Sequence, residues 1–235
     1  MDRPPGCDPG EPPAGADGCR ETRAVINPTQ TRIRRDWGVP TSIQPDLFGA
    51  ANTALPEGMR YEQDFLSAEE ETALLHRIGS LPLVPMQYRG YTALRRVVSY
   101  GGQYDFSSQR LGAAEPMPRW LQPLRERAAA WLGIDPDRFS HALVAEYRPG
   151  TPLGWHRDVP DFEDVVGVSL LNDAVMRFRP YPPREPKRAD VLRLTVAPRS
   201  IYLLRGAARW SWQHSVAPTR SLRYSITLRT PSSRR

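Results

Sequence analysis

The chain has 235 residues, a mass of 26.5 kDa and 40% apolar residues, which is enough for one folded domain with its own core. Its 25 prolines disfavour a helical bundle or a coiled coil, because proline breaks helices and lacks a backbone donor. The net charge of +6 is compatible with a polyanionic partner but indicates one only weakly.

The N-terminal sequence excludes several classes of protein. The two cysteines, Cys7 and Cys19, lie close to the start, so the sequence predicts no disulfide framework and no thiolate metal site. No apolar stretch approaches the roughly 20 residues of a membrane helix, and MDRPPGCDPGEPP lacks the apolar segment of a signal peptide. We expect a cytoplasmic protein with no membrane partner and, since nothing indicates an obligate oligomer, a monomer.

Composition changes along the chain and suggests two parts. Residues 1–22 are rich in Pro, Gly, Asp and Glu and have little to bury. We therefore expect residues 1–44 to form a disordered or irregular N-terminal tail and residues 45–230 to form one domain.

Two helices are predicted in the first half of this domain. Ser67 and Glu70 form a capping box before an apolar helical stripe that stops at Gly79. A second helix is expected over about 121–132, with Pro123 in its first turn and Gly133 just past its end.

The rest of the sequence consists of short β-prone segments between turns rich in Pro, Gly and Asp, which favours a sandwich or barrel. Strands do not alternate with helices, and this disfavours a doubly wound nucleotide-binding fold. The expected strands are 94–100, 142–147, 165–171, 175–178, 191–196, 201–204 and 222–228.

A His-x-Asp pair and a distant histidine are the candidate metal ligands. His156 and Asp158 are two residues apart, so in an extended segment they share one face, although such a pair also fits an ordinary surface loop. His214 lies further along, in WQHSVAP. Two histidines and one carboxylate can fill one face of an octahedron and leave three positions open, as in non-haem Fe(II) oxygenases. A zinc hydrolase is an alternative, since zinc can use the same ligand types.

The segment LRYSITLR, residues 222–229, alternates polar and apolar side chains, as a strand with two different faces does. Arg223, Ser225, Thr227 and Arg229 share the polar face. An exposed edge strand would have the same pattern. Two arginines on one face also suit a dicarboxylate, because guanidinium binds carboxylate through a bidentate fork.

Together, AEYRPGTPLGWHRD, WQHSVAP and LRYSITLR resemble the AlkB family of Fe(II)/2-oxoglutarate-dependent dioxygenases. The family pattern is His-x-Asp, a distant His, and Arg-x-Asn-x-Thr-x-Arg. The resemblance implies an α+β, mainly β fold with two buttressing helices. Its double-stranded β-helix, a jelly-roll core, would span 142–230, and a substrate lid with the helices would span 45–141.

The resemblance also implies roles for individual residues. His156, Asp158 and His214 would bind Fe(II) and form the catalytic centre. The co-substrate 2-oxoglutarate would be held at its distal carboxylate by Arg223 and near its metal-chelating end by Arg229, with contacts from Tyr147 and Ser225. Ala145 and Ser225 stand where the family often has asparagine, so two amide contacts are missing.

For the substrate, the resemblance implies an alkylated base in DNA or RNA. Dioxygen would be used to hydroxylate the alkyl carbon, which then leaves as an aldehyde, as in DNA repair. Arg95, Arg96 and Tyr104 lie in a basic and aromatic segment, and Asp161 could contact an exocyclic amine of the base. A solvated, arginine-rich surface would have the same composition.

Two further alternatives stay open from the sequence. One keeps the oxygenase chemistry but acts on a protein side chain or a small molecule. The other is a non-catalytic jelly-roll binding protein, which only Ala145 and Ser225 favour.

Overall fold

The computed structural model describes residues 55–233, except for 89–90, 106–109, 113–114 and 184–190. The chain divides into the units Met1–Phe48 and Gly49–Arg235, and every described residue belongs to the second. The expected tail, residues 1–44, lies outside the described residues. Among those that are described, no helix has the length and apolar character that crossing a membrane requires.

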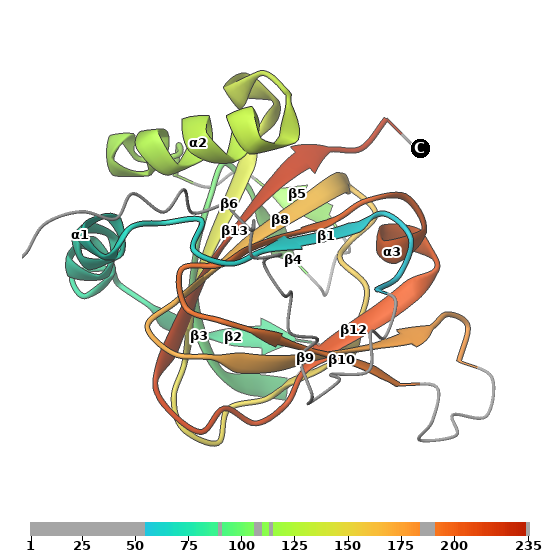
Figure 1. Ribbon diagram of the computed structural model, residues 1–235. Helices are drawn as coiled ribbons and strands as arrows, with labels where there is room; N and C mark the ends of the chain where they lie inside the picture. Colours follow the sequence, from blue (N-terminus) through green and yellow to red (C-terminus); the bar gives the residue numbers. More distant parts are fainter. Residues whose placement is uncertain (1–54, 89–90, 106–109, 113–114, 184–190, 234–235) are drawn as a thin grey trace, which may run out of the picture. The chain divides into compact units, whose positions relative to one another are not determined.

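Strands are the main secondary structure of the described chain (Figure 1). The helices are α1 (Ala68–Ile78), α2 (Gln122–Leu132) and α3 (Gly206–Trp210), with 3-10 turns η1 (Arg119–Leu121) and η2 (Pro136–Arg138). The strands are β1 (Met59–Glu62), β2 (Val84–Tyr88), β3 (Tyr91–Tyr100), β4 (Gln103–Asp105), β5 (Arg110–Gly112), β6 (His141–Tyr147), β7 (Leu153–His156), β8 (Phe162–Leu170), β9 (Ala174–Pro180), β10 (Leu192–Val196), β11 (Ile201–Leu204), β12 (Trp212–Val216) and β13 (Arg223–Pro231).

Two antiparallel sheets form the framework. The larger has seven strands in the order β1-β11-β8-β13-β6-β3-β2, and the smaller has four in the order β10-β9-β12-β7. Their facing sides share one apolar cluster, in which Met176 and Phe178 of β9 meet Val165 of β8 and Tyr202 of β11. This arrangement confirms the predicted jelly-roll, mainly β fold.

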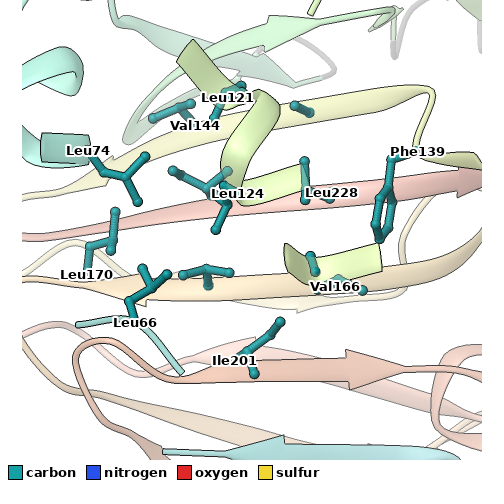
Figure 2. Close-up of a cluster of buried hydrophobic side chains, with 14 of the residues drawn as sticks. Leu66, Leu74, Leu121, Leu124, Phe139, Val144, Val166, Leu170, Ile201 and Leu228 are labelled. Atoms are coloured by element: carbon teal, nitrogen blue, oxygen red, sulfur yellow. The ribbon is translucent and has the colours of Figure 1, made fainter. Parts of the chain in front are cut away.

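The two long helices cover the other side of the seven-stranded sheet (Figure 1). Both ends predicted from sequence are present: the Ser67 capping box starts α1, and Gly133 follows α2 with a φ of 72°. Figure 2 shows the core beneath them, where Leu74 of α1 and Leu124 of α2 lie close to strands of the sheet. The helices therefore buttress the sheet, as expected.

The structure contains short strands that the sequence analysis did not predict. Among them, β1, β2 and β7 are the outermost strands of their sheets. An edge strand pairs on one side only and tolerates polar residues and glycine, so its apolar alternation is weak. By contrast, the expected strand 201–204 matches β11 in both bounds, because all four of its residues are buried.

Gly167 of β8 is the position in the large sheet where a side chain would do most harm. A β-carbon there would collide with the phenol ring of Tyr202, which lies on the neighbouring strand. We expect Gly167→Ala to lower the free energy of unfolding by about 1–3 kcal/mol through overpacking. Chemical denaturation would measure the loss. Because Gly154 has open space for a β-carbon, Gly154→Ala is the control. Equal stability of the two variants would contradict the prediction.

Candidate metal and co-substrate site

The two sheets bring the three expected metal ligands together. His156 ends β7 and lies directly opposite His214 of β12 in the antiparallel ladder. Their ring centroids are 4.2 Å apart, and His214 Nε2 is 3.5 Å from Asp158 Oδ2. One ligand atom from each of the three residues lies within 4.8 Å of the others. This cluster can hold one metal ion.

Both imidazoles are in the form that binds a metal. Burial lowers the pKa of His214 to about 3, and burial also lowers the pKa of His156, so both rings are neutral at physiological pH. His156 Nδ1 donates to the Gly154 carbonyl oxygen at 2.9 Å. That bond assigns the ring proton to Nδ1 and leaves the Nε2 lone pair for a ligand.

Asp158 presents one engaged and one free oxygen. Oδ1 accepts hydrogen bonds from Arg229 Nη2 at 2.8 Å and from Arg229 Nε at 3.0 Å. Oδ2 is buried and has no hydrogen-bond partner among the described residues. Burial alone would raise the pKa of Asp158, but the groups around it, with Arg229 first among them, together outweigh burial and hold that pKa far below its usual range. A free oxygen on a permanent carboxylate, beside two neutral imidazoles, fits a divalent cation.

Arg229 is held from its other side by His141. Arg229 Nη1 donates to His141 Nδ1 at 3.1 Å, and His141 is only 5% exposed. Burial, followed by the Arg229 charge, lowers the pKa of His141 to about 3, so the ring stays a neutral acceptor. The hydrogen bonds from Arg229 to His141 and to Asp158 orient the carboxylate toward the two metal-binding histidines.

Replacing His141 with glutamine is expected to make folding less sensitive to acid. With a pKa of about 3 in the folded protein and 6.5 ordinarily, His141 binds a proton more readily when unfolded, so stability falls as pH falls below 6.5. The loss is about 1.4 kcal/mol per pH unit. Glutamine does not titrate and keeps an acceptor for Arg229. Denaturation between about pH 7 and 4 should show the stability advantage of the wild type over His141→Gln shrinking as pH falls. An advantage that is constant with pH would contradict the assignment.

The three metal ligands line a pocket between the strands, and the polar face of β13 lines it as well. Arg223, Ser225, Thr227 and Arg229 all lie along its wall, whereas Ile226 and Leu228 pack in the core on the helix side. The alternation predicted for residues 222–229 is therefore confirmed. The pocket wall on this side is a row of donors.

Arg223 is a buried cation that forms no ion pair with any described acidic side chain. It is 2% exposed, and its Nε donates to Ser169 Oγ at 3.1 Å. Its Nη1 is buried and has no hydrogen-bond partner among the described residues. An unpaired buried charge is costly, so this guanidinium is suited to a carboxylate that enters the pocket.

Tyr147 and Arg95 complete the wall. Arg223 lies over the Tyr147 ring, with 5.0 Å from Cζ to the ring centroid, and Arg95 Nη1 donates to the Tyr147 hydroxyl at 3.4 Å. Burial alone would raise the pKa of Tyr147, but the charges of Arg95 and Arg223 leave it below its ordinary value. Arg95 is 9% exposed and its Nε has no partner among the described residues. Arg95, which the sequence analysis expected at the substrate, thus lies beside Tyr147 and Arg223, which it expected at the co-substrate.

Of the other residues expected at the substrate, Arg96 and Asp161 do not line this pocket. Arg96 lies next to Arg95 on β3 but forms an ion pair with Glu146 at 3.0 Å. Asp161 is exposed, and its backbone oxygen accepts from Ser232. Tyr104 belongs to β4, and its side chain lies outside the described residues.

Two residues of the site were missed in the sequence. Ser169 supports Arg223 from β8, and no local pattern marks it. His141 was not among the predicted site residues, although the sequence holds a signal for it. Tyr147 pairs with Arg223 across β6 and β13, so the antiparallel register must pair His141 with Arg229.

Comparison with known proteins agrees with this geometry. Residues 58–230 match the family model of the 2OG-Fe(II) oxygenase superfamily. The chain is 27% identical over 173 residues to the tRNA (carboxymethyluridine(34)-5-O)-methyltransferase alkbh8 of Xenopus tropicalis, covering 70% of this chain but only 26% of that protein. It is 27% identical over 170 residues to the probable RNA/DNA demethylase ALKBH6 of Danio rerio, covering 68% of this chain and 70% of that one.

The fold has a solved counterpart as well. The structure of OsALKBH1 superposes with a TM-score of 0.57 at 17% identity, covering 75% of this chain and 97% of the other. The His-Asp-His cluster lies inside the region that the family model matches. The chain therefore belongs to the 2OG-Fe(II) oxygenase superfamily, within its AlkB family, and is a dioxygenase that uses Fe(II), 2-oxoglutarate and dioxygen.

Proposed function

We propose that this dioxygenase removes alkyl groups from bases in DNA or RNA by hydroxylating the alkyl carbon, which then leaves as an aldehyde. Its AlkB relatives include a tRNA methyltransferase and a probable RNA/DNA demethylase by name, which supports a nucleic-acid substrate. The family model begins at residue 58 and ends at residue 230, which supports a catalytic domain over 45–230.

In this proposal His156, Asp158 and His214 hold the iron. Bound iron with 2-oxoglutarate and dioxygen supplies the oxidising power for an unactivated C–H bond. The chain supplies placement: Arg229 holds Asp158 Oδ1 so that Oδ2 faces the two imidazoles. The two histidines face each other on β7 and β12, so the sheet sets their spacing, and Asp158 follows in the segment directly after β7.

Arg223 anchors the distal carboxylate of 2-oxoglutarate in the proposed mechanism, and Tyr147 and Ser225 contact the same end. The observation that carries this assignment is the buried Arg223 Nη1 that has no partner among the described residues. Ser169 fixes the guanidinium through Nε. A carboxylate here would neutralise a charge that no described acidic side chain pairs with.

Arg95 also belongs to the co-substrate end in this proposal. The family's two amide contacts are absent at Ala145 and Ser225, while Arg95 brings a second guanidinium to the Tyr147 hydroxyl. A cation compensates for lost neutral donors because hydrogen bonds to charged groups are stronger.

Replacing Arg95 with methionine is expected to raise the KM for 2-oxoglutarate by about 10-fold, the loss of one charge-assisted contact, while the KM for the nucleic acid stays the same. Initial rates with each substrate varied in turn would measure both. Arg96→Met, which changes its neighbour outside the pocket, is the control. If the KM for the nucleic acid rises instead, Arg95 contacts the base of the substrate and not 2-oxoglutarate.

Product analysis on short oligonucleotides tests the proposed function. They would carry 1-methyladenine, 3-methylcytosine or ethenoadenine in single- and double-stranded DNA and in RNA. Each reaction would contain Fe(II) and ascorbate, with and without 2-oxoglutarate, and succinate would be quantified together with the base. We expect an adduct to disappear only when 2-oxoglutarate is present, and we expect succinate to form in proportion to the adduct removed.

The outcomes separate the alternatives. Succinate without repair of any adduct would contradict nucleic-acid dealkylation and favour a protein or small-molecule substrate. Repair that proceeds without 2-oxoglutarate would contradict the assigned chemistry.

A further inference from the structure

The outer face of the four-stranded sheet carries a group of arginines that the oxygenase site does not use. In β9, Ala174, Met176 and Phe178 are buried, so Arg177 and Arg179 project from the opposite side of the strand. Arg193 of β10 is exposed and lies directly opposite Arg177. We call Arg177, Arg179 and Arg193 the arginine face.

Among the described residues, this face lacks the acidic partners that other arginines have. The four strands of the sheet read LGWH, AVMRFRP, LRLTV and WQHSV and contain no Asp or Glu. None of the three arginines forms an ion pair with a described residue, whereas Arg125, Arg127 and other arginines on the described surface do. The positive charge of this face is therefore not neutralised within the described chain.

Folding alone does not favour the arrangement. Like charges directly opposite each other across an antiparallel pair destabilise a sheet, and Arg177 and Arg193 are such a pair. Arginines clustered on one face are the electrostatic footprint of a polyanionic ligand.

The arginines are also held in position. Trp155 of β7 lies beneath two of them, with the Cζ atoms of Arg177 and Arg179 at 5.3 and 4.5 Å from its ring. Arg177 Nε donates to Ser215 Oγ at 3.0 Å, and Arg179 Nε donates to Gln213 Oε1 at 2.8 Å. Each guanidinium is thus fixed by its Nε and by stacking, and both Nη groups of each lack a hydrogen-bond partner among the described residues.

The position of this face relates it to the metal ligands. Trp155 precedes His156 on β7, and Gln213 and Ser215 flank His214 on β12. The same two strands thus carry metal ligands on one side and the supports of the arginines on the other. A rigid guanidinium with free Nη groups recognises phosphate oxygens through its bidentate fork.

From this arrangement we propose that the arginine face binds the phosphodiester backbone of the nucleic-acid substrate, at nucleotides flanking the one that enters the pocket. The inference rests on the proposed function, since it takes nucleic acid as the substrate. The face contacts charge and not base edges, so it contributes affinity without sequence preference.

The test compares binding of unmodified single-stranded DNA and RNA oligonucleotides, followed by fluorescence anisotropy at several salt concentrations. The variant is Arg177→Gln/Arg179→Gln/Arg193→Gln in the full chain. Single strands lose affinity with salt at about 0.7 log units per phosphate contact. We therefore expect the slope of log affinity against log salt to fall by about 2 in this variant, with binding weakened for every sequence.

Two further variants make the test specific. Arg77→Gln/Arg119→Gln/Arg127→Gln removes the same charge from exposed arginines outside this sheet and should leave affinity and slope close to the wild type. Replacing the three arginines of the face with lysine keeps the charge and should retain most of the slope. The lysine variant also shows whether weaker binding in the glutamine variant comes from loss of stacking on Trp155 and not from loss of charge. Circular dichroism and 2-oxoglutarate affinity would report the integrity of the fold and pocket.

The outcomes separate this inference from the proposed function. A wild type that dealkylates oligonucleotides, with affinity and slope unchanged in the arginine-to-glutamine variant, overturns the arginine face alone. A wild type that binds oligonucleotides through these arginines and never dealkylates them supports the face and overturns the proposed activity. Loss of binding in the control triple to the same extent would mean that net charge, and not this face, is responsible.

Discussion

Replacing Asp158 with asparagine is expected to abolish turnover and Fe(II) binding together. The amide removes the negative charge that faces two neutral imidazoles, and its nitrogen would point a donor at either the metal or Arg229. The change also leaves Arg229 buried without its carboxylate, which costs about 3–5 kcal/mol of stability. Succinate formation, Fe(II) titration and thermal unfolding would measure the three effects.

A second variant separates loss of metal from loss of fold. His214→Gln removes one imidazole but leaves the Arg229–Asp158 pair in place, so it should lose iron and activity while its melting temperature without metal stays much closer to the wild type. Full activity in either variant would overturn the assignment of His156, Asp158 and His214 as the iron site.

Replacing Arg223 with methionine is expected to raise the KM and Kd for 2-oxoglutarate by about 10- to 100-fold, the value of charge-assisted hydrogen bonds to one carboxylate. The protein without ligands should not lose stability. Arg223 is buried with an unsatisfied Nη1, and an apolar side chain of similar length removes that penalty. Steady-state kinetics and denaturation of the unliganded protein would measure the two quantities.

This combination of weaker co-substrate binding with unchanged or higher stability is specific to a binding role. If Arg223 only supported the fold through Ser169, stability would fall and the KM for 2-oxoglutarate would change little. Arg223→Lys keeps the charge and loses the bidentate fork, so its KM should lie between those of the wild type and the methionine variant.

The sequence predicted those elements whose signals are local. Helix α1 begins at a capping box and α2 ends at a glycine, and both depend on residues within a few positions of each other. The order of strands in the sheets depends on pairings between distant segments, such as β13 with both β6 and β8. No short pattern encodes those pairings, so the sequence led to a sandwich or barrel and left its order open.

The same division holds for the site: residues within one segment could be predicted, and contacts between segments could not. The spacing of His156 and Asp158 and the alternation along residues 222–229 are patterns within one segment. Choosing between Arg95 and Arg96 required knowing which face of β3 points inward, and the surrounding LRRVVSY does not alternate. His141 and Ser169 act through contacts across strands, which appear only once the register is known.

The place of β13 in the large sheet has a consequence for synthesis of the protein. It is the last of the described strands to leave the ribosome, yet it lies between β6 and β8, both of which are made earlier. Until it arrives, those two strands keep open edges of the kind that lead nascent chains to aggregate. His156, Asp158 and His214 precede β13, while Arg223 and Arg229 belong to it. Final insertion of this strand therefore closes the sheet and delivers the pocket's arginines in one event, so the complete co-substrate site first exists when the domain has finished folding.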